Sequence, residues 1–125
     1  VASIGSFQPL PYQTVYGASK AFVLSFSEAL TGELLDTNIR VMALCPGTTE
    51  SRFMKNANAD TSSMNLAPAS KVVSSALTAY AKNRMYTVSG NINYLVSLIP
   101  RLVSRKRTVK IVANMFKDKV LGQSA

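Results

Sequence analysis

Three side chains near the start of the chain have the types and the spacing that carbonyl chemistry needs: Ser3, Tyr16 and Lys20. Tyr16 and Lys20 are four positions apart, so on a helix they would lie one above the other. A phenol ionises only in alkaline solution, and a cation beside it favours the phenolate, so this lysine would make the tyrosine a better proton donor and acceptor near neutral pH. A serine hydroxyl at an adjoining strand end would share the same substrate oxygen. The set suits a carbonyl and its alcohol.

The same spacing also has a simpler explanation, because tyrosine and lysine often meet on a helix surface without any chemistry. The elements that would position them decide between the two. Val1 to Ile4 is expected to end a strand, with Ser3 at its carboxyl end, and Gly5 begins a loop. Residues 14–35 predict a long amphipathic helix with an apolar stripe made of Ala18, Phe22, Phe26, Ala29, Leu30 and Leu34.

Residues 39–45 follow as a mostly apolar strand suited to burial on both faces, and Pro46 ends it. A strand, a helix and a second strand of this kind predict a parallel βαβ unit with a right-handed crossover. Ligands of open parallel sheets bind beyond the carboxyl ends of the strands. Ser3, the first turns of the helix and the turn at Pro46 and Gly47 are therefore expected to meet at one edge.

The second half of the chain is expected to cover this edge. Residues 52–67 lose periodicity and are rich in polar residues, which predicts a substrate lid, with a plain surface loop as the alternative. A helix should begin at Pro68 with a stripe that includes Val72, Val73 and Leu77, and a short strand should span residues 85–88. Residues 92–103 predict a short helix on the core or over the ligand cleft, and residues 91–125 together form a basic amphipathic helical region.

Composition limits the remaining possibilities. The chain of 125 residues is 47% hydrophobic, which suits one ordered domain, and its lack of histidine and single cysteine exclude zinc sites, histidine-based triads and an intrachain disulfide. No apolar run reaches the roughly 18 residues that span a bilayer. Half of the 14 basic residues follow position 100, where they form either a solvated helix face or a contact with an anionic membrane surface. No nucleic-acid motif accompanies them, so nucleic acid is not an expected partner.

The order Ser3, Tyr16-Gly-Ala-Ser-Lys20, Cys45-Pro46-Gly47-Thr-Thr-Glu-Ser51 resembles the second half of a short-chain dehydrogenase/reductase. The resemblance implies an α/β fold with a partial Rossmann-type doubly wound parallel sheet, in which residues 1–125 are the C-terminal part of a single domain. The chain has no glycine-rich dinucleotide motif. It is therefore expected to lack the cofactor-binding N-terminal half and to be inactive alone.

The resemblance also assigns roles to individual residues. Tyr16 would be the general acid/base, Lys20 would ease its ionisation and hydrogen-bond the nicotinamide ribose, and Ser3 would orient the substrate oxygen. The remaining cofactor contacts would come from Pro46 and Gly47 along the nicotinamide, the backbone of Thr49 at its carboxamide, and Ser51 near the phosphates.

The expected activity is NAD(P)-dependent hydride transfer to a carbonyl or from a secondary alcohol, with NADP slightly favoured over NAD. The apolar lid and the segment from Tyr94 to Ile99 favour a lipophilic substrate such as a ketoacyl chain, a steroid or a retinoid. The family implies a homodimer or homotetramer, and the expected location is cytoplasmic. The alternative is a non-catalytic binding or scaffold protein with this fold that docks on a membrane surface through its basic tail.

Overall fold

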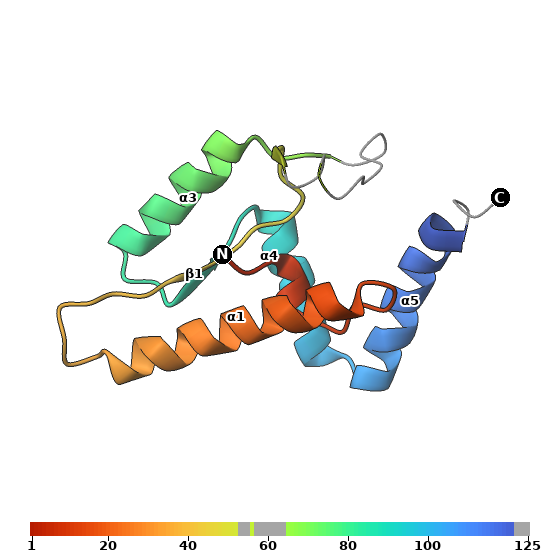
Figure 1. Ribbon diagram of the computed structural model, residues 1–125, viewed down its shortest axis with the longest axis horizontal. Coiled ribbons are helices and arrows are strands. Elements are labelled where there is room, and N and C mark those ends of the chain that lie inside the picture. Colours follow the sequence, from red (N-terminus) through yellow and green to blue (C-terminus); the bar gives the residue numbers. More distant parts are fainter. Residues whose placement is uncertain (53–55, 57–64, 122–125) are drawn as a thin grey trace.

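The computed structural model describes residues 1–52, 56 and 65–121 of the chain. The elements are, in order, η1 (Ile4–Phe7), α1 (Thr14–Glu33), β1 (Ala43–Cys45), α3 (Ala69–Ala81), β2 (Tyr86–Val88), α4 (Asn91–Leu102) and α5 (Arg105–Leu121). Figure 1 shows α1 and α3 on opposite sides of the short sheet, with α5 lying apart from it. The order of helices and strands agrees with the sequence pattern.

The sheet is parallel, as predicted, with Ala43 opposite Tyr86 and Cys45 opposite Val88. The start of the chain extends it on the other side of β1, because the N–H of Ala2 donates to the carbonyl of Leu44 at 2.8 Å. The N–H of Ile4 likewise donates to the carbonyl of Pro46 at 3.0 Å, and the chain then turns into η1. Val1 to Ile4 therefore bonds to β1 as a strand would, but a 3₁₀ turn replaces the loop that was predicted from Gly5.

The strands are shorter than the sequence pattern suggests. β1 covers only the last three residues of the predicted strand 39–45, and β2 begins at Tyr86 instead of residue 85. A turn follows α3, and β2 is only three residues long, so β1 pairs with it at only three positions. This length suffices to bring the carboxyl ends of the strands together.

The core lies between α1 and the sheet. Its buried members are Ala2, Leu24, Ala43 and Cys45, and Phe7, Val23, Tyr86 and Val88 pack against them. The rings of Phe7 and Tyr86 meet with centroids 5.8 Å apart, which joins η1 to β2. The turn that carries Ser3 is thus anchored to the far strand of the sheet.

The prediction that the apolar stripe of α1 faces the core was wrong for its two phenylalanines. Phe22 is 66% exposed and Phe26 is 52% exposed, and the two rings stack on the outer side of the helix. The buried positions are Gly17 and Leu24. Because α1 carries apolar residues on both sides, its sequence does not show which side meets the sheet. The side with the smaller residues allows the helix to approach the sheet more closely.

A similar correction applies to α3, where only Val72 of the predicted stripe is buried while Val73 and Leu77 are more than half exposed. The N-cap of α4 is Gly90, whose φ of 91° is a conformation that residues with side chains rarely adopt, and Pro100 lies inside the last turns of this helix. No helix among the described residues is long and apolar enough to cross a bilayer.

Candidate active site

Ser3 caps the 3₁₀ turn at the carboxyl end of the first strand-like segment. Its hydroxyl accepts a hydrogen bond from the N–H of Gly5 at 3.1 Å, and the hydroxyl of Ser6 accepts one from the N–H of Ser3 at 3.1 Å. The side chain is 8% exposed. Because the hydroxyl oxygen of Ser3 already accepts one bond, its own proton can be donated to another oxygen.

Tyr16 and Lys20 lie in the first turns of α1, both half-buried. The ammonium of Lys20 is 5.8 Å from the centroid of the Tyr16 ring, so the predicted pairing of these two side chains on one face of α1 is present. The same ammonium donates to the carbonyl of Val1 at 3.2 Å. Lys20 therefore contacts both the tyrosine and the segment that ends in Ser3.

Close packing holds the first turn of α1 against the preceding loop. Leu10 is buried between Gly5 and Gly17, and a Cβ on Gly17 would come within 3.0 Å of the Cβ of Leu10. A methyl group at Gly17 would have to displace Leu10 or the helix. The glycine beside Tyr16 thus permits the contact that positions the tyrosine.

The turn after β1 carries the residues predicted to line the nicotinamide, and Pro46 and Gly47 are both half-buried there. The amide of Asn93, in the first turn of α4, lies so close to Gly47 that any Cβ at that position would overlap it. Asn93 also donates to the carbonyl of Ser89 at 2.7 Å. This asparagine connects the turns after both strands, and sequence analysis missed it because the contact depends on where α4 packs.

The main-chain N–H and C=O groups of Thr49 point away from the segment that contains Ala67. Its hydroxyl donates to the carbonyl of Gly47 at 3.0 Å, while the residues on either side bond to Ala67: Thr48 accepts from its N–H and Glu50 donates to its carbonyl. In a parallel bridge the middle residue directs its own N–H and C=O to the opposite side. The N–H of Thr49 is therefore directed to the side away from Ala67. Its contact with a carboxamide stays a prediction.

Ser51 is exposed and lies where the predicted lid begins. Most of that lid, residues 52–67, falls outside the described residues, including Phe53, Met54 and Met64. Its two ends are joined by the bridge between Thr49 and Ala67 and by a hydrogen bond from the Thr48 hydroxyl to the carbonyl of Asn65 at 3.2 Å. The segment therefore leaves and re-enters the described structure beside the Pro46 turn.

Cys45 lies in the core immediately before this turn and is fully buried. Burial raises the pKa of its thiol to about 11, and the negative charge of Glu28 acts in the same direction. The thiol is neutral at physiological pH, so it is a packing group and a poor nucleophile. Among the described residues no cluster of His, Cys, Asp or Glu could hold a metal ion.

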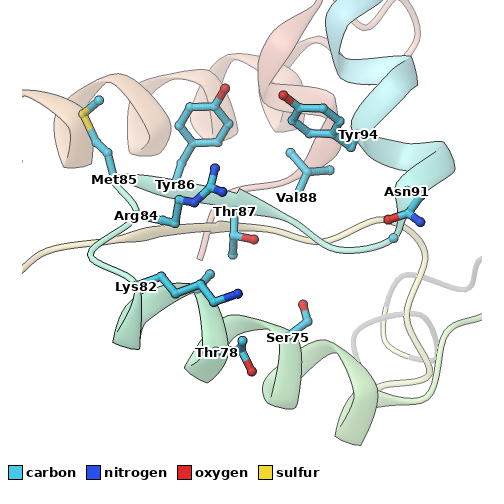
Figure 2. Close-up of a pocket in the computed structure, with 12 residues that line it drawn as sticks. Ser75, Thr78, Lys82, Arg84, Met85, Tyr86, Thr87, Val88, Asn91 and Tyr94 are labelled. Carbon is cyan, nitrogen blue, oxygen red and sulfur yellow. The ribbon is translucent and has the colours of Figure 1, made fainter.

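The structure also has a cavity of about 610 Å³ at the outer edge of β2, between α3 and α4. Figure 2 shows Thr87 pointing toward α3, whereas Tyr86 and Val88 point to the opposite face of the strand. Polar and basic side chains, among them Ser75, Thr78, Lys82 and Arg84, contribute to its wall. None of the predicted site residues lines it, so it is separate from the edge that carries Ser3 and Tyr16.

With this geometry described, comparison with known proteins is informative. A family model described as short chain dehydrogenase matches residues 1–62, which contain Ser3, Tyr16, Lys20 and the Pro46 turn. Residues 1–62 belong to the short-chain dehydrogenase family. A solved short-chain dehydrogenase from Sphingobium yanoikuyae, in complex with NADPH, superposes on 70% of the chain with a TM-score of 0.65 and 30% sequence identity. The predicted α/β Rossmann-type fold is confirmed by this match.

Several curated members of the short-chain dehydrogenase family are similar over the same length. A sulfoacetaldehyde reductase of Chromohalobacter salexigens is 51% identical over 53 residues, which are 42% of this chain and 21% of that protein. A 3-oxoacyl-[acyl-carrier-protein] reductase of Chlamydia trachomatis is 38% identical over 58 residues, 46% of this chain and 23% of that protein. A 3-ketodihydrosphingosine reductase of Bacteroides thetaiotaomicron is 40% identical over 58 residues, 46% of this chain and 22% of that protein. The match thus spans about a fifth of each relative, and 34% of the solved structure.

Proposed function

We propose that this chain supplies the catalytic edge of an NAD(P)-dependent oxidoreductase that interconverts a carbonyl and a secondary alcohol. One observation carries the proposal: the Lys20 ammonium contacts the Tyr16 ring and also the carbonyl of Val1, two residues before Ser3. The helix that bears Tyr16 and Lys20 is thereby joined to the segment that bears Ser3, so the two pieces of chain with the family's catalytic residue types lie together at the carboxyl end of the sheet.

Each side chain then has one task. Tyr16 gives a proton to the substrate oxygen during reduction and takes one from the alcohol during oxidation. The Lys20 cation stabilises the phenolate that forms, and Ser3 donates its hydroxyl proton to the same substrate oxygen as negative charge develops there. A bound nicotinamide supplies or accepts the hydride.

The chain's own residues fit the nicotinamide end of such a cofactor. Gly47 has no side chain where α4 approaches, and the N–H of Thr49 is directed away from Ala67. In this proposal Pro46 lies along the nicotinamide, Ser51 meets the phosphates and Lys20 meets the ribose. NADP is favoured over NAD because the similar solved structure holds NADPH. The adenosine end requires a glycine-rich turn, which we assign to a preceding part of the same domain.

A lipophilic carbonyl compound is the proposed substrate. Two similar reductases are named for 3-oxoacyl and 3-ketodihydrosphingosine substrates, and α4 presents half-buried Val96 and Leu98 in the helix that packs on η1. Another similar protein is named a sulfoacetaldehyde reductase, after a small polar aldehyde, so a substrate panel must include both kinds.

Replacing Tyr16 by Phe tests the proposal in the full-length protein. Loss of the phenol proton should lower kcat by about 10²- to 10⁴-fold, the usual contribution of general acid–base catalysis, while the Kd for NADPH changes little. NADPH oxidation with long-chain ketones, and with short polar aldehydes as the comparison, gives the measurement. A Tyr16→Phe enzyme that keeps its turnover would refute the assigned role.

We also propose that the parent protein is a homodimer or homotetramer with α1 in the contact. The support is the exposed stack of Phe22 and Phe26 on the outer side of that helix, since paired aromatic rings on a surface mark interaction sites. Sedimentation of a Phe26→Glu variant should reveal a smaller assembly. An unchanged assembly would exclude this face.

A second candidate function, docking on a membrane, is favoured by the surface of α4 and α5. Ile92, Leu95, Ile99 and Leu102 form an exposed apolar stripe on α4, and Arg101, Arg105, Lys106 and Arg107 are exposed around the turn to α5. Apolar side chains next to basic ones suit the surface of an anionic bilayer, which a cytoplasmic protein would meet peripherally. Co-sedimentation with anionic vesicles should decrease for a chain that ends at Val103, and equal binding of both chains would exclude the tail as the anchor.

A further inference from the structure

Ser6 makes a connection between the two elements that carry the proposed catalytic residues. Its hydroxyl accepts a hydrogen bond from the N–H of Ser3 at 3.1 Å and donates one to the main-chain carbonyl of Lys20 at 2.8 Å. The second bond joins residues fourteen positions apart in the sequence. One half-buried hydroxyl therefore links the turn that holds Ser3 to the turn of α1 that holds Lys20.

The bond to Ser3 controls where the catalytic hydroxyl points. Ser3 and Ser6 cap each other, since the Ser3 hydroxyl accepts from the N–H of Gly5 while the Ser6 hydroxyl accepts from the N–H of Ser3. This reciprocal arrangement fixes the main chain of Ser3 and, through Gly5, one lone pair of its side chain. Removing the Ser6 hydroxyl would remove the bond that holds the main chain of Ser3, the residue that donates a proton to the substrate oxygen in the proposed reaction.

The bond from Ser6 to Lys20 ends on the main-chain carbonyl of Lys20, so it does not depend on where the lysine side chain lies. A second polar link between these segments is the bond from the Lys20 ammonium to the carbonyl of Val1. In the proposed reaction this ammonium turns to the cofactor ribose and leaves Val1. The link through Ser6 persists in that state, so it can keep the two elements in register while the lysine side chain works elsewhere.

We infer that Ser6 is a positioning residue, which holds the Ser3 hydroxyl in register with Tyr16 and Lys20 so that serine and tyrosine reach the same substrate oxygen. This rests on the proposed function. Two donors converge on one atom only if their elements are fixed relative to each other, and a misplacement of about 1 Å can slow a reaction by roughly 10²-fold. Ser6 touches neither substrate nor cofactor in this scheme and acts through Ser3 and Lys20.

The test compares Ser6→Ala and Ser6→Thr with a matched control in the full-length protein. Ser27→Ala is the control, because Ser27 is also half-buried and donates to a main-chain carbonyl at 2.8 Å, but wholly within α1. Ser6→Ala should lower kcat by about 10- to 100-fold while the Kd for NADPH stays within about threefold, as expected when an orientation is lost but a binding contact is not. Ser6→Thr should restore most of kcat, since it keeps the hydroxyl, and Ser27→Ala should leave kcat unchanged.

The outcomes separate the inference from the proposed function. A wild-type protein that shows no hydride transfer refutes the proposed function, and the inference with it. An active wild type with a fully active Ser6→Ala variant overturns the inference alone. So does a Ser6→Thr enzyme as slow as Ser6→Ala, or a kcat that falls equally in Ser27→Ala, because either result would show a loss unrelated to this hydroxyl link. Hydrogen exchange at the Ser3 amide gives a further measurement, which should accelerate in Ser6→Ala and not in Ser27→Ala.

Discussion

At the scale of single residues, the most informative contacts are those that position Tyr16 without touching its phenol. Gly17 is the neighbour of Tyr16 and packs against Leu10, and Lys20 reaches back to Val1. Only the spacing of Tyr16 and Lys20 was visible in the sequence. The need for a glycine at position 17 was not, because Leu10 approaches it from a loop whose path no local pattern specifies.

Replacing Gly17 by Ala should therefore test the packing beside Tyr16. The new methyl group would come within 3.0 Å of Leu10 and force a shift, although alanine suits a helix better than glycine does. We expect the overpacking to dominate, with a loss of about 1–3 kcal/mol in the free energy of unfolding and a lower kcat. Gly32→Ala is the control: it lies near the other end of α1 with no atom within 4 Å of a Cβ, and it should be neutral or stabilising. A Gly17→Ala protein as stable as the Gly32→Ala protein would contradict this reading.

The buried thiol of Cys45 gives a dependence of stability on pH. Its pKa is about 11 in the folded protein against 9.0 for the exposed group, because burial disfavours the thiolate. Below pH 9 the thiol is neutral in both states, and between pH 9 and 11 only the unfolded state loses the proton, so stability falls as pH rises. Wild type should lose stability relative to Cys45→Ala over this interval, by at most about 1.4 kcal/mol per pH unit. Urea unfolding at pH 8, 9.5 and 11 measures it, and a constant difference between the two proteins would show that the thiol does not contribute.

At the scale of elements, the sequence predicted the existence and order of the helices and strands but not which faces are buried. Residues 14–35 were expected to form a helix, and α1 spans Thr14–Glu33. Helix formation follows from local spacing and propensity, whereas burial depends on which neighbour the helix meets. The exposed Phe22 and Phe26 and the buried Leu24 lie within one and a half turns of each other, so the periodic pattern did not distinguish the two sides.

The burial of Leu24 on α1 can be tested against an exposed leucine near the end of the helix. Leu24 is 7% exposed in the core, and Leu35, just beyond the end of α1, is 76% exposed. Leu24→Ala should lower the free energy of unfolding by about 2–5 kcal/mol, because it removes buried apolar surface and leaves a cavity, while Leu35→Ala should change it by less than about 0.5 kcal/mol. Chemical denaturation of both variants gives the comparison. Similar losses in the two would contradict the assignment of Leu24 to the core.

In the candidate site, too, the residues that a local sequence pattern marks were predicted, and those that depend on contacts between distant segments were not. Ser3, Tyr16, Lys20 and the Pro46 turn were predicted because strand ends and helix starts can be read from the sequence and parallel topology brings them to one edge. Ser6 and Asn93 were missed, since Ser6 bonds to the main chain of α1 fourteen residues away and Asn93 packs against Gly47 in the turn after β1. Such contacts depend on the distance between two folded segments, which neither residue type nor periodicity specifies.

At the scale of the whole molecule, the sheet has two open edges within the described residues: one is the outer edge of β2, and the other is the outer edge of the segment Val1–Ile4, which bonds to β1. The main-chain groups of Thr87 point toward β1, because the flanking bonds run from Ala43 to Met85 and from Ser89 to Cys45. The main-chain N–H and C=O groups of Tyr86 and Val88 therefore point to the open edge of β2. The segment Val1–Ile4 borders the sheet on the opposite side. Strand edges of this kind pair with further strands, so the chain of 125 residues should associate when it is studied alone.

The 125 residues are also expected to be inactive by themselves. The chain holds the residues proposed for proton transfer but no glycine-rich turn to bind a pyrophosphate, so the 125 residues alone should show negligible NADPH oxidation and weak dinucleotide affinity. Joining them to a segment that carries a glycine-rich dinucleotide-binding turn should restore cofactor binding, and turnover should then depend on Tyr16. Isothermal titration with NADPH and a coupled carbonyl assay on both proteins measure the difference. Turnover by the 125 residues alone, or a monodisperse monomer that unfolds cooperatively, would show that this edge is a complete unit, and the division of the site into a chemical half and a cofactor-holding half would then be wrong.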